Sequence, residues 1–244
     1  MHTFRKAVLI TSMAALALSA LAVPTTAANG AKGTLGIVNG IPGQRVDICL
    51  NGREIKSRVG YGGKKSKVTN TGFKTIKIFK ADPRTCRGTK LAQKTYLLGY
   101  GDDFTIVVNK KAPKWVKFDN KVPRFLGSIW PLGVLGPDAY VAVRHAADLG
   151  TVAMRISTEY AWSPSAEAPW VEGDEHAWTG YNPPATANYM VAAARPDKPG
   201  AIARSGAVYL KPSRRYEFIL LGTWTGNAKM IVWKRYVTAG GQIL

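Results

Sequence analysis

An apolar alternation that occurs twice constrains the fold of this chain more than any other sequence feature. Leu35 and Ile37 alternate with small or polar residues, and Val46, Ile48 and Leu50 do the same. The pattern returns 106 residues later as Val141, Val143, Val152, Met154 and Ile156. Alternation with period 2 is typical of a strand that has one face on a core and one in water. Such a strand pair, repeated at fixed spacing, predicts two copies of one β domain.

A third strand extends the repeat. The cleanest alternation in the chain includes Phe104 and Ile106, and Phe218 and Leu220 echo these two residues 114 residues later. Because the offset grows from 106 to 114, we expect the second copy to carry about eight extra residues in its middle.

The first copy is expected to contain eight strands and almost no helix. Asn51-Gly52 lies between two strand patterns and predicts a tight hairpin. Outside the N-terminal segment no apolar period of 3.6 is sustained, so the predicted fold class is all-β. The expected strands are 34–39, 45–51, 55–59, 64–69, 73–80, 90–98, 103–109 and 114–118.

The N-terminal segment 1–28 reads as a secretory signal peptide. Arg5 and Lys6 precede the apolar run 7–23, Pro24 follows it, and small residues end at Ala28. Cleavage after Ala28 is therefore expected, with export from the cytoplasm. The alternative is an uncleaved membrane anchor, although a run of 17 residues is at the short limit for a spanning helix.

We expect a first β-sandwich domain at 29–118, a linker at 119–138 and a second β-sandwich domain at 139–244. The linker is rich in Pro and Gly, which interrupt strand ladders. It is also rich in large apolar residues, so we expect it to pack between the two domains rather than lie in water. The alternative is that it forms the last strand of the first copy.

The two cysteines, Cys49 and Cys86, are expected to form a disulfide in an exported protein. If Val46, Ile48 and Leu50 face the core, Cys49 faces away from it. The bridge would then tie the outer face of a sheet to the loop around Cys86 without crossing the sandwich. Two free thiols are the alternative.

Short motifs in both copies resemble a secreted bacterial family known only as a domain of unknown function. Its repeat has a strand that ends in His, a short loop, and a strand reading Val-Asp-Val-x-Val-Asn-Gly. The segment Val46–Gly52 matches the second strand, and Gly101–Val108 is similar to the closing strands. Asn39 stands where the family has His, whereas His145 keeps it in the second copy. The resemblance implies tandem extracellular immunoglobulin-like β-sandwiches and carries no catalytic residues.

Signatures of catalysis and metal binding are absent from the sequence. There is no His-Glu-x-x-His, Cys-x-x-Cys or Gly-x-Ser-x-Gly motif, and Gly60–Ser66 departs from a phosphate-binding loop and is interpreted as a mobile hairpin tip. His145 and His176 are too few for a structural zinc site beside a disulfide. His145 is interpreted as a hydrogen-bonded histidine at the core edge. No catalytic residue, metal or cofactor is expected.

The segment 159–186 is the most site-like part of the chain, because it combines aromatic side chains with carboxylates. Aromatic rings can stack on sugars, and a carboxylate pair could hydrolyse a glycosidic bond, here through Glu172, Asp174 or Glu175. The alternative is that the rings fill a β core. The candidate glycan contacts are Trp162, Trp170, Glu172, Trp178 and Tyr181.

Positive charge is concentrated in the first copy. Residues 29–120 hold 19 Lys/Arg and 6 Asp/Glu, whereas residues 121–244 hold 13 and 9. Lysines gathered at one end or on neighbouring strands would attract polyanions. Protection of sheet edges and solubility are the alternative explanation. The candidate polyanion-binding residues are Lys64, Lys65, Lys67, Lys74, Lys77, Lys80, Lys110, Lys111, Lys114 and Lys117.

Together these features predict an exported, non-enzymatic binding or structural module of the bacterial cell envelope. Its first domain is expected to associate with an anionic envelope polymer or polysaccharide. No nucleic-acid-binding signature is present, and membrane contact is expected only through an uncleaved signal. The alternatives are a glycan-active hydrolase or carbohydrate-binding protein that uses segment 159–186, and an adhesion module that binds protein partners by strand addition.

Overall fold

The computed structural model describes residues 30–109, 114–120, 139–158, 175–181, 188–196, 200–211, 214–223 and 226–236. Every regular element in these ranges is a β-strand, and none of the ranges contains a helix. No helix long and apolar enough to cross a membrane occurs in these ranges. The predicted all-β fold class is confirmed, whereas the predicted signal peptide and linker residues 121–138 lie outside the described residues.

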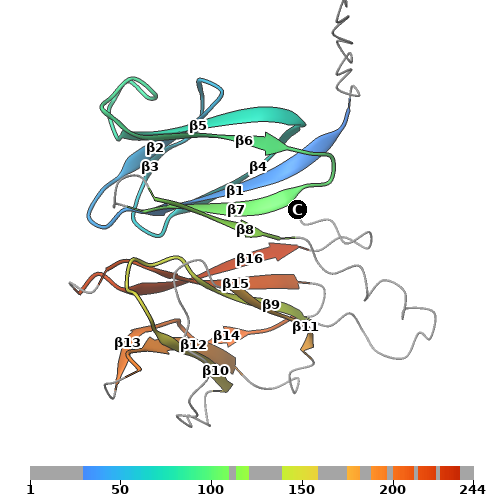
Figure 1. Ribbon diagram of the computed structural model, residues 1–244, viewed down its shortest axis with the longest axis vertical. Helices are drawn as coiled ribbons and strands as arrows, with labels where there is room; N and C mark the ends of the chain where they lie inside the picture. Colours follow the sequence, from blue (N-terminus) through green and yellow to red (C-terminus); the bar gives the residue numbers. More distant parts are fainter. Residues whose placement is uncertain are drawn as a thin grey trace, which may run out of the picture.

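The N-terminal half, β1 to β8, forms one mixed sheet and one antiparallel sheet that enclose one core (Figure 1). The strand orders are β4-β1-β7-β8 and β3-β2-β5-β6. All eight strands lie where the alternation predicts them, within two residues at each end. Their bounds are β1 Lys32–Gly40, β2 Val46–Leu50, β3 Arg53–Val59, β4 Lys64–Asn70, β5 Gly72–Lys80, β6 Lys90–Leu98, β7 Asp103–Asn109 and β8 Trp115–Asp119.

The C-terminal half, β9 to β16, also forms two sheets around a core of its own. One sheet has the order β11-β9-β15-β16, and the other contains β10-β12-β13 with β14 paired to β12. In both halves the first strand lies between an antiparallel neighbour and a parallel one, which are β4 and β7 for β1 and β11 and β15 for β9. The bounds are β9 Ala139–His145, β10 Ala153–Thr158, β11 Glu175–Tyr181, β12 Asn188–Ala194, β13 Ala201–Arg204, β14 Val208–Tyr209, β15 Arg214–Leu221 and β16 Lys229–Tyr236.

Strand pairing corrects one detail of the sequence repeat. Leu35 lies opposite Phe104 in the β1–β7 pair, but its counterpart Val141 lies opposite Tyr216, two residues before Phe218. The predicted equivalence of Phe104 and Phe218 is therefore shifted by two residues along β15. A two-residue shift leaves every side chain on the same face, which explains why the alternation alone does not detect it.

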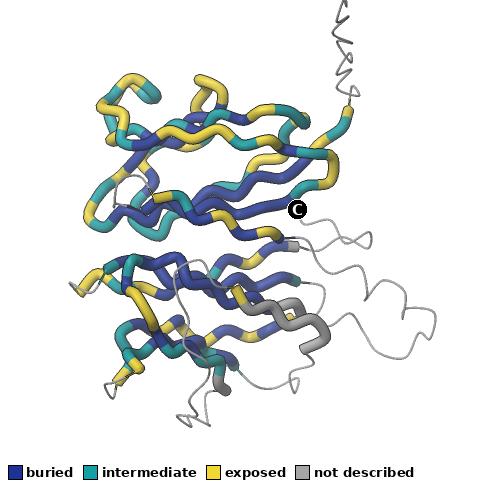
Figure 2. The backbone as a smooth tube through the Cα atoms, viewed as in Figure 1, coloured by how far each residue is buried: buried dark blue, intermediate teal, exposed yellow. Residues whose placement is uncertain are grey.

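The two halves stack through the sheets that contain β1 and β9 (Figure 1). A third apolar cluster joins them, with Val107 and Phe118 from the N-terminal half and Ile219 and Trp233 from the other. Both faces of β7 are therefore buried, as Figure 2 shows for the inner strands. The expectation that the second face of this strand lies in water was wrong, because that face packs against the other half.

Two turns of the N-terminal half, at Asn51-Gly52 and at segment 60–63, connect strands in different ways. Asn51 and Gly52 have φ values of 50° and 79°, which is the left-handed geometry of the predicted hairpin between β2 and β3. Segment 60–63 instead connects strands of different sheets, β3 and β4. Gly62 N donates to Asn39 O at 2.8 Å, and the Tyr61 hydroxyl donates to Asn227 O at 2.6 Å in the other half. This turn is therefore part of the contact between the halves rather than a hairpin tip.

The disulfide between Cys49 and Cys86 is present as predicted. Ile48 and Leu50 belong to the core of the N-terminal half, whereas Cys49 is buried on the outer face of the same strand. The neighbouring Asp47 also holds the surrounding backbone, since its carboxylate accepts from Arg58 N at 2.9 Å and Asp82 N at 3.3 Å. The bridge thus ties the β5–β6 loop to the outer face and does not cross the sandwich.

Candidate functional site

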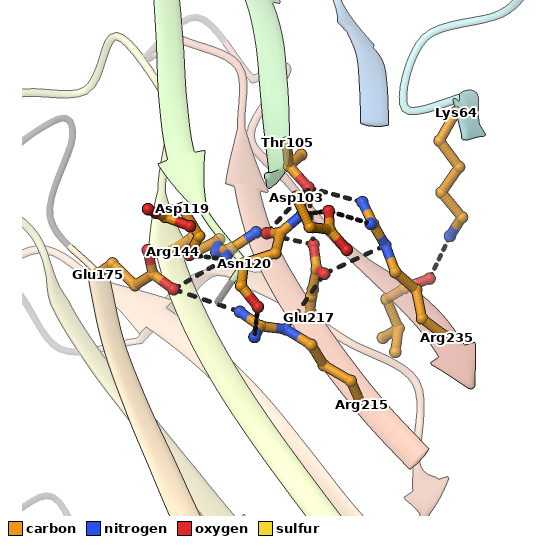
Figure 3. Close-up of polar contacts among 11 residues, drawn as sticks. Lys64, Asp103, Thr105, Asp119, Asn120, Arg144, Glu175, Arg215, Glu217 and Arg235 are labelled. Atoms are coloured by element: carbon orange, nitrogen blue, oxygen red, sulfur yellow. Dashed lines mark hydrogen bonds and ion pairs between the residues drawn. The ribbon is translucent and has the colours of Figure 1, made fainter. Parts of the chain in front are cut away.

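A buried cluster of charged side chains lies between the two halves (Figure 3). Strands of the C-terminal half supply three arginines, Arg144 on β9, Arg215 on β15 and Arg235 on β16. Glu217 on β15 lies among them and is fully buried. The alternation of β15 explains the placement, because Tyr216 and Phe218 on the opposite face enter the core of the C-terminal half.

Glu217 is the centre of this cluster. Its carboxylate accepts from Arg144 Nη1 at 2.8 Å and lies 3.3 Å from Arg215 Nε and 3.2 Å from Arg235 Nε. A second carboxylate, that of Glu175 on β11, lies 2.8 Å from Arg144 Nη2. The arginines are thus neutralised in part by acids from their own half.

The N-terminal half completes the cluster with side chains from β7 and the end of β8. Asp103 Oδ1 lies 3.1 Å from Arg235 Nη1, and the Thr105 hydroxyl donates to Glu217 at 3.1 Å while it accepts from Arg235 Nη2 at 2.7 Å. The Asn120 side chain donates to Asp103 at 2.6 Å, and the Asn120 carbonyl accepts from Arg215 at 2.7 Å. Polar pairing therefore crosses from one half to the other.

The surroundings shift two acid pKa values in opposite directions. Burial alone would raise the pKa of Glu217, but the three surrounding arginines hold it below its usual range. Burial raises the pKa of Asp103, and Arg235 only partly opposes that effect. Glu217 is therefore ionised at neutral pH and balances the arginines.

This cluster is a structural contact between the two halves, and we call it the joint. Three arginines and three carboxylates, those of Asp103, Glu175 and Glu217, balance in formal charge and pair with one another. Arg235 also stacks on Trp233, with its guanidinium carbon 3.9 Å from the ring centroid. A buried charge is costly unless it is paired, so this arrangement fixes how the two sheets meet.

A different, exposed surface is the candidate binding site. We call it the basic edge, the side of the N-terminal half where β6 of one sheet approaches β8 of the other. Tyr96 from β6 contacts Phe104 and Trp115, with ring centroids 5.9 Å and 6.4 Å apart. Three exposed lysines border these rings, namely Lys94, Lys117 and Lys114, which precedes Trp115 in the chain.

The aromatic rings position two of these lysines. Lys94 Nζ lies 5.4 Å from the Tyr96 centroid, and Lys117 Nζ lies 4.3 Å from the Phe104 centroid. Cation–π attraction of this kind orients an ammonium group without neutralising its charge. Burial also raises the pKa of Tyr96, so its hydroxyl stays protonated beside the lysines. The edge thus combines fixed positive charges with a partly exposed aromatic surface.

The structure brings only some of the predicted polyanion-binding lysines to this edge. Lys114 and Lys117 lie on it, whereas Lys110 and Lys111 lie outside the described residues. Strand β4, which carries Lys64, Lys65 and Lys67, forms the opposite edge of the same sheet as β8, and Lys74, Lys77 and Lys80 lie on β5 in the other sheet.

Two of the remaining lysines are engaged within the protein. Lys64 Nζ donates to Val232 O across the two halves. Burial lowers the pKa of Lys64; Glu217 opposes this shift, whereas Arg235 and nearby lysines add to it. Lys74 is buried, and its ammonium donates to Thr71 O at 3.1 Å. The ammonium groups of these two lysines therefore make hydrogen bonds within the protein and are not part of an exposed binding surface.

Most of the predicted glycan contacts cannot be placed. Trp162, Trp170 and Glu172 lie outside the described residues. Trp178 and Tyr181 belong to β11, where they pair with Val141 and Ala139 of β9. Glu175, one of the carboxylates considered for hydrolysis, pairs with Arg144 in the joint.

His145 has the role that its strand position predicts. It is fully buried, its Nδ1 accepts from Ala147 N at 3.3 Å, and its Nε2 then donates to Gly150 O at 2.9 Å. No group of three or more His, Cys, Asp or Glu side chains suited to a metal ion occurs among the described residues.

Sequence reasoning missed Lys94, and also the arginine cluster. Lys94 sits on the same predicted strand as Tyr96, so an aromatic–lysine pairing was detectable locally. The arginines of the joint gave no such signal, because they lie far apart in the sequence and meet only when β9, β15 and β16 pair in one sheet.

Comparison with known proteins does not assign this chain to a family. No protein-family model matches this chain, and no curated protein matches it either.

Proposed function

We propose that this protein is an exported, non-enzymatic binding module of the bacterial cell envelope whose basic edge associates with an anionic polymer. The observation that carries the proposal is the pair of lysines, Lys94 and Lys117, held over aromatic rings that belong to one cluster. Lysine ammonium groups act as hydrated point charges, so they suit a repeating phosphate or carboxylate polymer without a fixed sequence.

Export and a tandem immunoglobulin-like architecture are part of this proposal. The leader-like segment 1–28 and the Cys49–Cys86 disulfide support export, because disulfides persist in oxidising compartments. The repeated position of β1 between β4 and β7, and of β9 between β11 and β15, supports two copies of one domain.

Salt-dependent binding to a polyanion tests the role of the basic edge. The double variant Lys94→Ala/Lys117→Ala should lose about 30-fold in affinity for poly(glycerol phosphate) at moderate salt, given about 1 kcal/mol for each lysine near an anionic surface. Its affinity should also fall less steeply with rising salt, because fewer counterions are released. Affinity is measured by titration at several NaCl concentrations, with heparin as a second polymer.

A charge-matched variant provides the control. Lys67→Ala/Lys80→Ala removes the same charge from two exposed lysines on other strands. It should change affinity by about twofold or less if the basic edge is the site. Equal losses in the two double variants would show that only net charge matters, and unchanged binding in both would remove the polymer proposal.

A further inference from the structure

The three most exposed large hydrophobic side chains of the described residues gather at one end of the N-terminal half. We call this set the apolar tip; Phe73 is 73%, Leu97 63% and Tyr100 77% exposed. Phe73 and Leu97 are direct partners in the β5–β6 ladder, so their side chains share one face. Their neighbours Lys74 and Leu98 are buried, which fixes this face as the outer one.

The apolar tip surrounds the point where the described chain begins. Thr71, two residues before Phe73, donates its N–H to Ala31 O at 3.0 Å. Gly101, next to Tyr100, donates its N–H to Lys32 O at 3.0 Å. The β4–β5 and β6–β7 turns thus flank the start of β1 on two sides, at the end of the half that Figure 1 shows beside the beginning of β1.

The sequence before β1 relates this end to a membrane. The apolar run 7–23 is separated from Gly30 by residues 24–29, which can span at most about 20 Å when fully extended. While that run occupies a bilayer, in transit or as an anchor, the apolar tip is within reach of the same lipid surface.

Charge and side-chain chemistry favour an anionic bilayer as the occupant. Exposed Lys32 and Lys94 lie near the tip, and the carboxylate of Asp102, the nearby acid, accepts from Gly99 N at 2.6 Å. Lysines close to an anionic leaflet are attracted to it, and tyrosine is enriched at the headgroup level. We propose that Phe73, Leu97 and Tyr100 form a docking surface for a lipid bilayer that contains anionic phospholipid.

Binding to lipid vesicles tests the proposal. The protein is expressed from the full chain, including residues 1–28, so that the expression host can export it and remove a leader if it is cleaved. The probe is phosphatidylcholine vesicles with and without phosphatidylglycerol, measured by cosedimentation. Phe73→Ser/Leu97→Ser/Tyr100→Ser should lower partitioning to the anionic vesicles about tenfold or more, because three apolar side chains leave the interface. Tyr209→Ser, at a 43% exposed tyrosine of the C-terminal half, should change it by about twofold or less.

Two further measurements make the outcome decisive. The triple variant should keep the wild-type melting temperature and poly(glycerol phosphate) affinity, since its three sites are exposed and it leaves Lys94 and Lys117 unchanged. If the wild type does not bind the polymer but the vesicle results are as expected, the proposed function is contradicted and this inference is not. The inference is overturned if the triple variant binds the anionic vesicles as well as the wild type does, or if the wild type does not bind them at all. A wild-type dimer that the triple variant dissociates would assign the tip to self-association instead.

Discussion

At the residue scale, Glu217 is the side chain on which the joint depends most. It is the one fully buried carboxylate among Arg144, Arg215 and Arg235 in the described structure. Glu217→Gln keeps the size but leaves the arginines undercompensated, so we expect a loss of about 3–5 kcal/mol in the free energy of unfolding. Urea denaturation at neutral pH measures it, with exposed Glu54→Gln as a control expected to change stability by about 0.5 kcal/mol or less.

The pH dependence of this difference checks its cause. The folded pKa of Glu217 is lowered, so the stability that its ionised form contributes is complete above the ordinary glutamate pKa. That contribution is lost as the pH falls through the lowered folded pKa. The gap between the wild type and Glu217→Gln should therefore narrow in acid, and a gap below about 1 kcal/mol at neutral pH would contradict the assigned role.

At the element scale, β1 is a strand with two packed faces, and Gly36 makes this possible. Leu35 and Ile37 enter the core, while Gly36 faces the other half. A Cβ at Gly36 would lie 2.8 Å from the Trp233 ring and still closer to the Arg235 guanidinium, so these buried side chains or the sheets that carry them would have to shift. Gly36→Ala should cost about 1–3 kcal/mol, seen as a melting temperature lower by several degrees.

A second glycine of the same half provides the comparison for this substitution. A Cβ at Gly60 would meet no atom within 4 Å, so Gly60→Ala should leave the melting temperature nearly unchanged. If Gly36→Ala melts like Gly60→Ala, the close approach of β1 to β16 does not exist in solution.

At the scale of the whole molecule, the two halves should unfold together. Separation of the halves would expose the charged groups of the buried cluster and the apolar cluster that contains Phe118 and Trp233. Calorimetry should therefore show one transition with equal calorimetric and van't Hoff enthalpies. Added salt at about 1 M should not split it, because buried ion pairs are screened far less than exposed ones. Two resolved transitions in the wild type would mean that the halves are independent.

Sequence patterns were enough to predict the strands of the N-terminal half, the Asn51-Gly52 hairpin, the Cys49–Cys86 bridge and the core role of His145. These features follow from period-2 alternation and turn chemistry, which act over a few residues, and from a cysteine count that leaves one pairing. The folded structure was needed to establish that the second faces of β1, β7 and β15 are buried, that three arginines meet around Glu217, and that Lys94 and Lys117 share one edge. Alternation distinguishes the two faces of a strand, but it does not say whether water or another sheet covers the second face, because that depends on contacts between residues far apart in the chain.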